Sequence, residues 1–170
     1  MELLIPGLAL VALMVWASTR IKRNAAAAFE QETIETDDFI IQKPDGFLNN
    51  LNGDPRNAVE MYSKEYGEAA TGERAGRVTL TISNGSINET VAAIAKDGDT
   101  VVEDITEVIG GRHYRLIETT RVEKEAECAV TYKLAEKDED IYKLEAIRLA
   151  ETGDEFRGKV DALVASFELK

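Results

Sequence analysis

The apolar positions of this chain follow two different patterns. Residues 3–19 contain no charged side chain, whereas beyond Arg20 the apolar residues are spaced as in strands and helices. As a helix, this uncharged run would span roughly 25 Å at about 1.5 Å per residue, a little less than a hydrocarbon core of about 30 Å. We predict a membrane anchor over residues 1–23. Its apolar side chains are Leu3, Leu4, Ile5, Leu8, Leu10, Val11, Leu13, Met14, Val15 and Trp16.

The charges around the run predict its orientation. Arg20, Lys22 and Arg23 follow the run, and the only charged side chain before it is Glu2. Because cationic flanks stay on the cytoplasmic side, we expect a single-pass inner-membrane protein with a cytoplasmic C-terminal domain. The alternative is a signal sequence, cleaved or uncleaved, with a periplasmic domain behind it. Small residues at 16–18 and 25–28 could suit a peptidase, although a signal peptide normally carries its cations before the apolar core.

Beyond the anchor, we divide the chain into a stalk and one domain. Ala25–Ala28 favours helix, and residues 30–38 are acidic without an apolar stripe, so residues 24–37 read as a helical stalk. Residues 38–170 are enough for one domain with a real core. Residues 58–66 fit either a helix or a strand, and we favour a strand.

The rest of the domain alternates between strand and helix signals. Apolar and polar residues alternate along several segments, namely 77–82, 101–109, 114–121, 128–134 and 141–149, after a first strand at 39–44. The last four of these segments are separated by short turns such as Gly110-Gly111, which indicates an antiparallel meander.

Two helices are predicted by capping boxes, in which a serine or threonine and a glutamate three residues later satisfy the first amides. These boxes are Ser86-x-x-Glu89 and Thr152-x-x-Glu155. The second helix carries an apolar stripe wide enough to lie on a sheet, formed by Phe156, Val160, Leu163, Val164 and Phe167. The fold class is therefore α+β, with a central antiparallel sheet packed by helices.

Several short strings occur in a familiar order. They are Phe-x-Ile-x-Lys-Pro-x-Gly-Phe at 39–47, Tyr-Ser-x-x-Tyr at 62–66, Gly-Arg-His-Tyr at 111–114, Tyr-Lys-Leu at 142–144 and Ala-Ser-Phe at 165–167. Residues 38–170 resemble the PsbP-like superfamily in these strings and in the order of elements. The resemblance implies accessory or binding roles more often than catalysis. With its anchor, the chain also resembles small single-pass membrane proteins of Gram-negative bacteria.

Charge narrows the partners. The chain has a net charge of −12, and residues 24–170, with 17 cations and 31 acids, have a net charge of −14. Nucleic acid is not expected as a partner, because phosphate binding needs a basic face. We expect the lipid bilayer to bind the N-terminal helix and a protein or small molecule to bind the domain. A single cysteine, Cys128, rules out an intramolecular disulfide.

Candidate chemistry is sparse. His113 is the only histidine, and Cys128 alternates with Val130 and Tyr132 as a core residue would. A hydrolase-like Cys–His pair would need both side chains to be adjacent in space. Asp97-Gly-Asp99 reads as a helix-ending turn rather than a cation site, since the full calcium-loop spacing is missing. We therefore expect no catalytic, cofactor or metal residues, and a non-enzymatic binding domain.

Overall fold

The computed structural model describes residues 14–20, 26–64, 74–96 and 99–170. Residues 14–20 are helical, and Met14, Val15 and Trp16 are at least 60% exposed. No helix within these described ranges is long and apolar enough to cross a membrane. Most of the predicted anchor (residues 3–13) and two of its three flanking cations, Lys22 and Arg23, lie outside the described residues. The anchor and its orientation therefore stay predictions.

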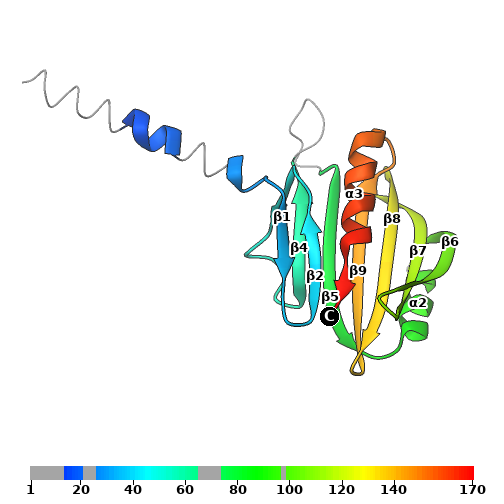
Figure 1. The fold of residues 1–170 in the computed structure, drawn as a ribbon. Coiled ribbons are helices and arrows are strands. Elements are labelled where there is room, and N and C mark those ends of the chain that lie inside the picture. Colours follow the sequence, from blue (N-terminus) through cyan, green and yellow to red (C-terminus); the bar gives the residue numbers. More distant parts are fainter. Residues whose placement is uncertain (1–13, 21–25, 65–73, 97–98) are drawn as a thin grey trace, which may run out of the picture.

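A seven-stranded antiparallel sheet forms the centre of the domain (Figure 1). Its spatial order is β3-β4-β5-β9-β8-β7-β6, so four consecutive strands, β6 to β9, are joined by hairpins. The strands are β3 (Phe47–Asn49), β4 (Asn57–Ser63), β5 (Gly76–Asn84), β6 (Thr100–Ile109), β7 (Arg112–Glu123), β8 (Ala126–Lys137) and β9 (Asp140–Leu149). The predicted meander and the strand favoured within 58–66 are confirmed over these bounds.

Each face of this sheet is covered by different elements. On one face lie α3 (Asp154–Ser166) and a three-stranded sheet in the order β1-β2-β10. The strands of that small sheet are β1 (Glu32–Glu35), β2 (Phe39–Lys43) and β10 (Glu168–Leu169). On the other face, α2 (Ile87–Lys96) packs near β8. The domain is therefore layered, with two apolar cores on opposite sides of the large sheet.

Strand alternation sorts side chains between the two cores. On β9, Leu144 and Ala146 join the core beneath α3, whereas Ile147 and Leu149 join the core beside α2. The predicted stripe of α3 is confirmed, because Val160, Leu163, Val164 and Phe167 are buried and Phe156 packs against them. Phe167 follows the helix directly and lies between Phe39 and Tyr114.

The tight turns of the meander require positive φ. Gly110 and Gly111 have φ of 58° and 82°, as a two-residue hairpin turn demands. The other two hairpins achieve the same conformation without glycine, at Lys124-Glu125 and at Asp138-Glu139. The left-handed region is unfavourable for such side chains, so strand pairing on both sides holds these turns.

The two capping boxes have different outcomes. In the first, the Ser86 backbone amide donates to Glu89 at 3.1 Å and the Glu89 amide donates to the Ser86 hydroxyl at 3.3 Å, as predicted. The second is wrong. Gly153 is the N-cap of α3 and has no side chain to offer, while the Thr152 hydroxyl donates to the Leu149 carbonyl at 2.7 Å. The Thr152 hydroxyl, which the motif predicts to cap the helix, therefore bonds to the end of β9 instead.

The expected helical stalk also differs from the structure. Residues 26–27 are helical, but Glu32–Glu35 form β1, which pairs with β2. The acidic segment has no apolar stripe because it contacts the domain by strand pairing with β2 and through one side chain, Ile34, that packs against the core. The Lys43 ammonium holds the segment that leads into β1, because it donates hydrogen bonds to the carbonyls of Ala28 and Glu30.

Candidate functional site

The structure separates the two residues considered for catalysis. Cys128 pairs with Arg121 near one end of β7, and His113 pairs with Val108 at the other end. The eight residue steps from His113 to Arg121 correspond to roughly 26 Å at about 3.3 Å per residue. Burial raises the pKa of the Cys128 thiol, and His113 is exposed. The alternative of a hydrolase-like Cys–His pair is therefore wrong for this domain.

The carboxylates do not form a metal centre within the described ranges, where no group of three or more His, Cys, Asp or Glu side chains is placed to hold an ion. Asp97 lies outside those ranges. Asp99 is not an exposed turn residue, because its side chain is fully buried. It accepts hydrogen bonds from the Tyr132 hydroxyl at 2.8 Å and the Thr119 hydroxyl at 2.9 Å.

A cavity of about 300 Å³ opens where β5 begins and β9 ends, at the upper end of the sheet in Figure 1. We call it the basic cavity. It is lined by Tyr62, Arg74, Ala75, Gly76, Arg77, Glu123, Lys124, Ala126, Cys128, Ile147, Arg148 and Leu149. Four of these residues are cations and one is an acid, which is the reverse of the chain's overall balance. The cavity therefore has a local charge that the composition conceals.

The arginines of the basic cavity are held by specific contacts. The Arg74 guanidinium lies 4.3 Å from the centroid of the Tyr62 ring and donates to the Ser63 carbonyl at 3.0 Å. Arg77 is half exposed and lies 3.8 Å from the Glu123 carboxylate, a distance at which the attraction is weak. Both guanidinium groups keep donors available to an incoming anion, since each carries five.

The floor of the basic cavity is apolar. Ile147, Leu149 and Cys128 are all at most 9% exposed and belong to the core beside α2. They reach the cavity because alternate residues of β8 and β9 point to that face, which α2 covers only in part. An apolar floor with a few placed charged groups is the usual character of a small-molecule site.

Behind the cavity lies a polar network centred on Arg121. Its guanidinium donates to Glu145 at 2.9 Å, lies 2.6 Å from Glu123 and lies 3.8 Å from Asp99. It also donates to the Tyr132 hydroxyl at 3.3 Å. Glu123 is shared with Arg77, so the network continues to the rim of the basic cavity.

Burial and charge set the protonation states in this network. Burial, reinforced by the Glu145 carboxylate, raises the pKa of Tyr132, which stays a neutral hydrogen-bond donor. Burial alone would lower the pKa of Arg121, but Glu145 and the neighbouring acids raise it. Within the described ranges, Asp99 Oδ1 and Arg121 Nε are buried without a hydrogen-bond partner. Buried polar groups without partners lower the stability of the fold, whereas the remaining hydrogen bonds of the network hold its side chains in one arrangement.

The comparisons with known proteins give the fold. No protein-family model matches the sequence, and no curated protein matches it either. The structure is similar to cyanobacterial PsbP from Synechocystis sp. PCC 6803, with a TM-score of 0.53 and 13% identity over 83% of this chain and 92% of that one. A second similar structure is LpqN of Mycobacterium tuberculosis, described as involved in cell envelope biogenesis. Its TM-score is 0.58, with 11% identity over 83% of this chain and 91% of that one.

A third similar structure is the Ran-binding protein Mog1p of Saccharomyces cerevisiae, with a TM-score of 0.55 and 9% identity over 83% of this chain and 96% of that one. At such identities the shared property is the fold. The domain therefore has the PsbP-like α+β fold, as the resemblance in the sequence predicted.

Sequence reasoning missed both the basic cavity and the Arg121 network. The cations of the cavity come from residues 74–77, 124 and 148, which only the sheet order brings together. One signal was present for the network: Arg121 lies at a position of β7 that faces the same side as the buried Ile117. A charged residue at an inward position indicates a buried ionic partner.

Proposed function

We propose that this chain is a non-enzymatic binding domain tethered to a membrane, and that its ligand is a small organic anion held in the basic cavity. The observation that carries the proposal is a group of cations above an apolar floor, in a chain whose residues 24–170 have a net charge of −14. The cations at the rim would attract the carboxylate or similar anionic group of the ligand. The apolar part of the ligand would then pack on Ile147 and Leu149. The fold neighbour described as Ran-binding supports a binding role.

The tether gives the binding domain its place in the cell. We propose that residues 1–23 span the inner membrane once, that residues 24–31 connect them to the domain, whose first strand is β1, and that the domain faces the cytoplasm. Arg20, Lys22 and Arg23 support this orientation through the positive-inside rule. A membrane tether would raise the domain's concentration near other membrane proteins.

Orientation can be tested with one engineered thiol. Glu155 is highly exposed on α3, so Glu155→Cys in a Cys128→Ala background provides an accessible thiol. An impermeant thiol reagent should label it only after the cells are lysed. Labelling of intact cells would place the domain on the other side of the membrane and overturn the cytoplasmic proposal.

Ligand binding can be tested with two probes of nearly the same shape. Benzoate carries the anion and benzamide does not, so calorimetric titration of the full chain in lipid nanodiscs isolates the contribution of charge. We expect benzoate to bind at least about tenfold more tightly, as one lost charge-assisted hydrogen bond would imply. Equal affinities for the two probes would reject an anion site.

Variants assign the binding to the basic cavity. Arg77→Gln should reduce benzoate affinity toward that of benzamide, because Arg77 is a half-exposed cation of the rim. Arg157→Gln is the matched control, since Arg157 is a half-exposed arginine on α3 that does not line the cavity. If the two variants weaken benzoate equally, the attraction is a general charge effect.

A further inference from the structure

Among the strands that the structure describes, β6 is a long free edge. It pairs with β7 on one side and is the last strand in the order of the seven-stranded sheet. It has ten residues, whereas β3 at the opposite edge has three. A free edge presents unpaired N–H and C=O groups that can pair with another strand. Figure 1 shows β6 at the outer side of the sheet, with α2 on the adjacent face.

The side chains of β6 protect this edge only in part, because its three acids discourage an apolar or acidic strand but not a basic one. Natural edges are usually shortened, or carry lysine or proline, to prevent pairing. The sequence of β6, Thr-Val-Val-Glu-Asp-Ile-Thr-Glu-Val-Ile, contains neither, and its one irregularity is a bulge between Val101 and Glu103. Val102, Ile105 and Val108 are 65%, 42% and 60% exposed. From Glu103 to Ile109 the strand is regular, and exposed β-branched residues there suit an added strand.

The charges of this region define the partner. β6 carries Glu103, Asp104 and Glu107 and no cation. Arg115 neutralises Asp104 at 2.8 Å, and Lys133 lies 3.5 Å from Glu107. The third acid, Glu103, has no cation within ion-pair distance among the described side chains.

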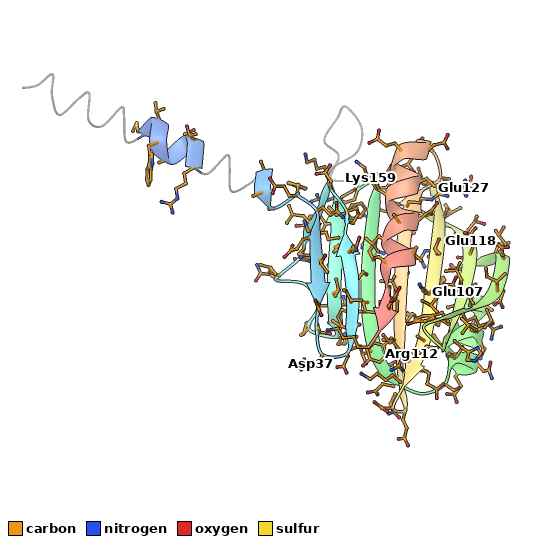
Figure 2. The ribbon with its side chains drawn as sticks, viewed as in Figure 1. Asp37, Glu107, Arg112, Glu118, Glu127 and Lys159 are labelled. Carbon is orange, nitrogen blue, oxygen red and sulfur yellow. The ribbon has the colours of Figure 1, made fainter. Side chains whose placement is uncertain are left out.

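Glu103 also faces a like charge. It lies directly opposite Glu118 of β7 in the strand register, and like charges in that position are destabilising. Figure 2 places Glu107 and Glu118 on this side of the sheet, with Glu127 above them at the start of β8. A lysine or arginine of an added strand could lie beside Glu103 and Glu118 and relieve their repulsion.

We infer that β6 is a docking edge for an extended segment of another protein, in which lysine or arginine alternates with aliphatic residues. Main-chain hydrogen bonds along β6 would supply the affinity, and the acidic side chains would select the basic partner, as in other strand-addition complexes. A second copy of this chain fits less well, because pairing β6 with itself would bring three acids against three acids. The edge is separate from the basic cavity, which lies over β5, β9 and the β7–β8 turn.

The test uses the full chain in nanodiscs and a fluorescent ten-residue peptide in which lysine alternates with valine. The control is the same peptide N-methylated at alternate residues, which keeps its charges and removes main-chain donors on one edge. Anisotropy should show the unmodified peptide binding at least about tenfold more tightly than the control. Hydrogen exchange should slow at residues 100–109 when it binds. Equal binding of both peptides would mean that charge alone acts, and would overturn the inference.

Variants distinguish the edge from the domain's general acidity. Glu103→Gln should weaken the peptide by about two- to fivefold, the effect of one cross-strand ion pair. Glu155→Gln, which changes an exposed side chain on α3, should leave the peptide affinity unchanged. Equal losses in the two variants would contradict a site at β6. Sedimentation of the full chain without peptide supplies the remaining outcome, since a dimer lost in Ile105→Lys would assign the edge to a second copy.

Discussion

The Arg121 network makes the sharpest prediction about stability. Asp99→Ala removes a fully buried carboxylate that accepts hydrogen bonds from Tyr132 and Thr119. Each hydrogen bond to a charged acceptor is worth about 1.5–3 kcal/mol, and the relieved cost of burying the charge offsets part of the loss. Arg121 keeps Glu145 as its partner and is not left unpaired. We expect a net destabilisation of about 3 kcal/mol.

The measurement is urea denaturation of the full chain in nanodiscs, followed by circular dichroism of its strands. A loss of about 3 kcal/mol would also lower Tm by roughly 10 °C for a domain of this size. The matched control is Asp104→Ala, which removes another aspartate facing an arginine, Arg115 at 2.8 Å, in a partly exposed position. An exposed pair contributes about 1 kcal/mol or less.

Comparison of the two variants decides the argument. If Asp99→Ala costs no more than Asp104→Ala, burial does not strengthen the Asp99 contacts and the reasoning is refuted. Asp99→Asn provides a further check, because it keeps one acceptor oxygen and should lose less stability than Asp99→Ala.

The remaining predictions concern the core, a turn and pH. Phe167→Ala should cost about 3–5 kcal/mol in urea denaturation, since Phe167 is fully buried, whereas Leu51→Ala, at 91% exposed, should change little. Glu139→Gly should stabilise by about 1 kcal/mol because Glu139 has a φ of 72°; Glu155→Gly, in the first turn of α3, should instead destabilise, because it adds a poor helix former and removes an acid from the helix N-terminus. Burial lowers the pKa of Lys133 below its ordinary value of 10.5. Between those two pKa values the unfolded chain binds more protons, so Lys133's contribution to the unfolding free energy rises with pH. The wild type should therefore gain stability relative to Lys133→Met as pH approaches 10.5, and a flat difference in denaturation would contradict the lowered pKa.

The parts of the fold that depend on local periodicity were predictable from the sequence. The alternation over 128–134, the glycines at 110–111 and the stripe of α3 each specify an element without reference to the rest of the chain. Thr152 shows where this reasoning fails. A capping motif offers its hydroxyl to the nearest free group, and the end of β9 provided the Leu149 carbonyl.

The functional site depends on contacts between distant residues, so the sequence could not place it. Arg77 and Lys124 line one cavity because the order β5-β9-β8-β7 brings the start of β5 and the β7–β8 turn to the same end of the sheet. Asp99 looked like a turn residue because its partners, Tyr132 and Thr119, lie on strands that come later in the chain. The distance between His113 and Cys128 follows from the strand register, and no local sequence pattern contains that register.

Methyl NMR of the full chain in nanodiscs tests the central claim most directly, because Ile147 and Leu149 form the floor of the basic cavity. During a benzoate titration their methyl signals should shift and saturate, while those of Leu163 beneath α3 should not move. Benzamide should cause much smaller shifts. Equal shifts with both compounds, or floor methyls that do not respond to benzoate, would contradict an anion-binding cavity.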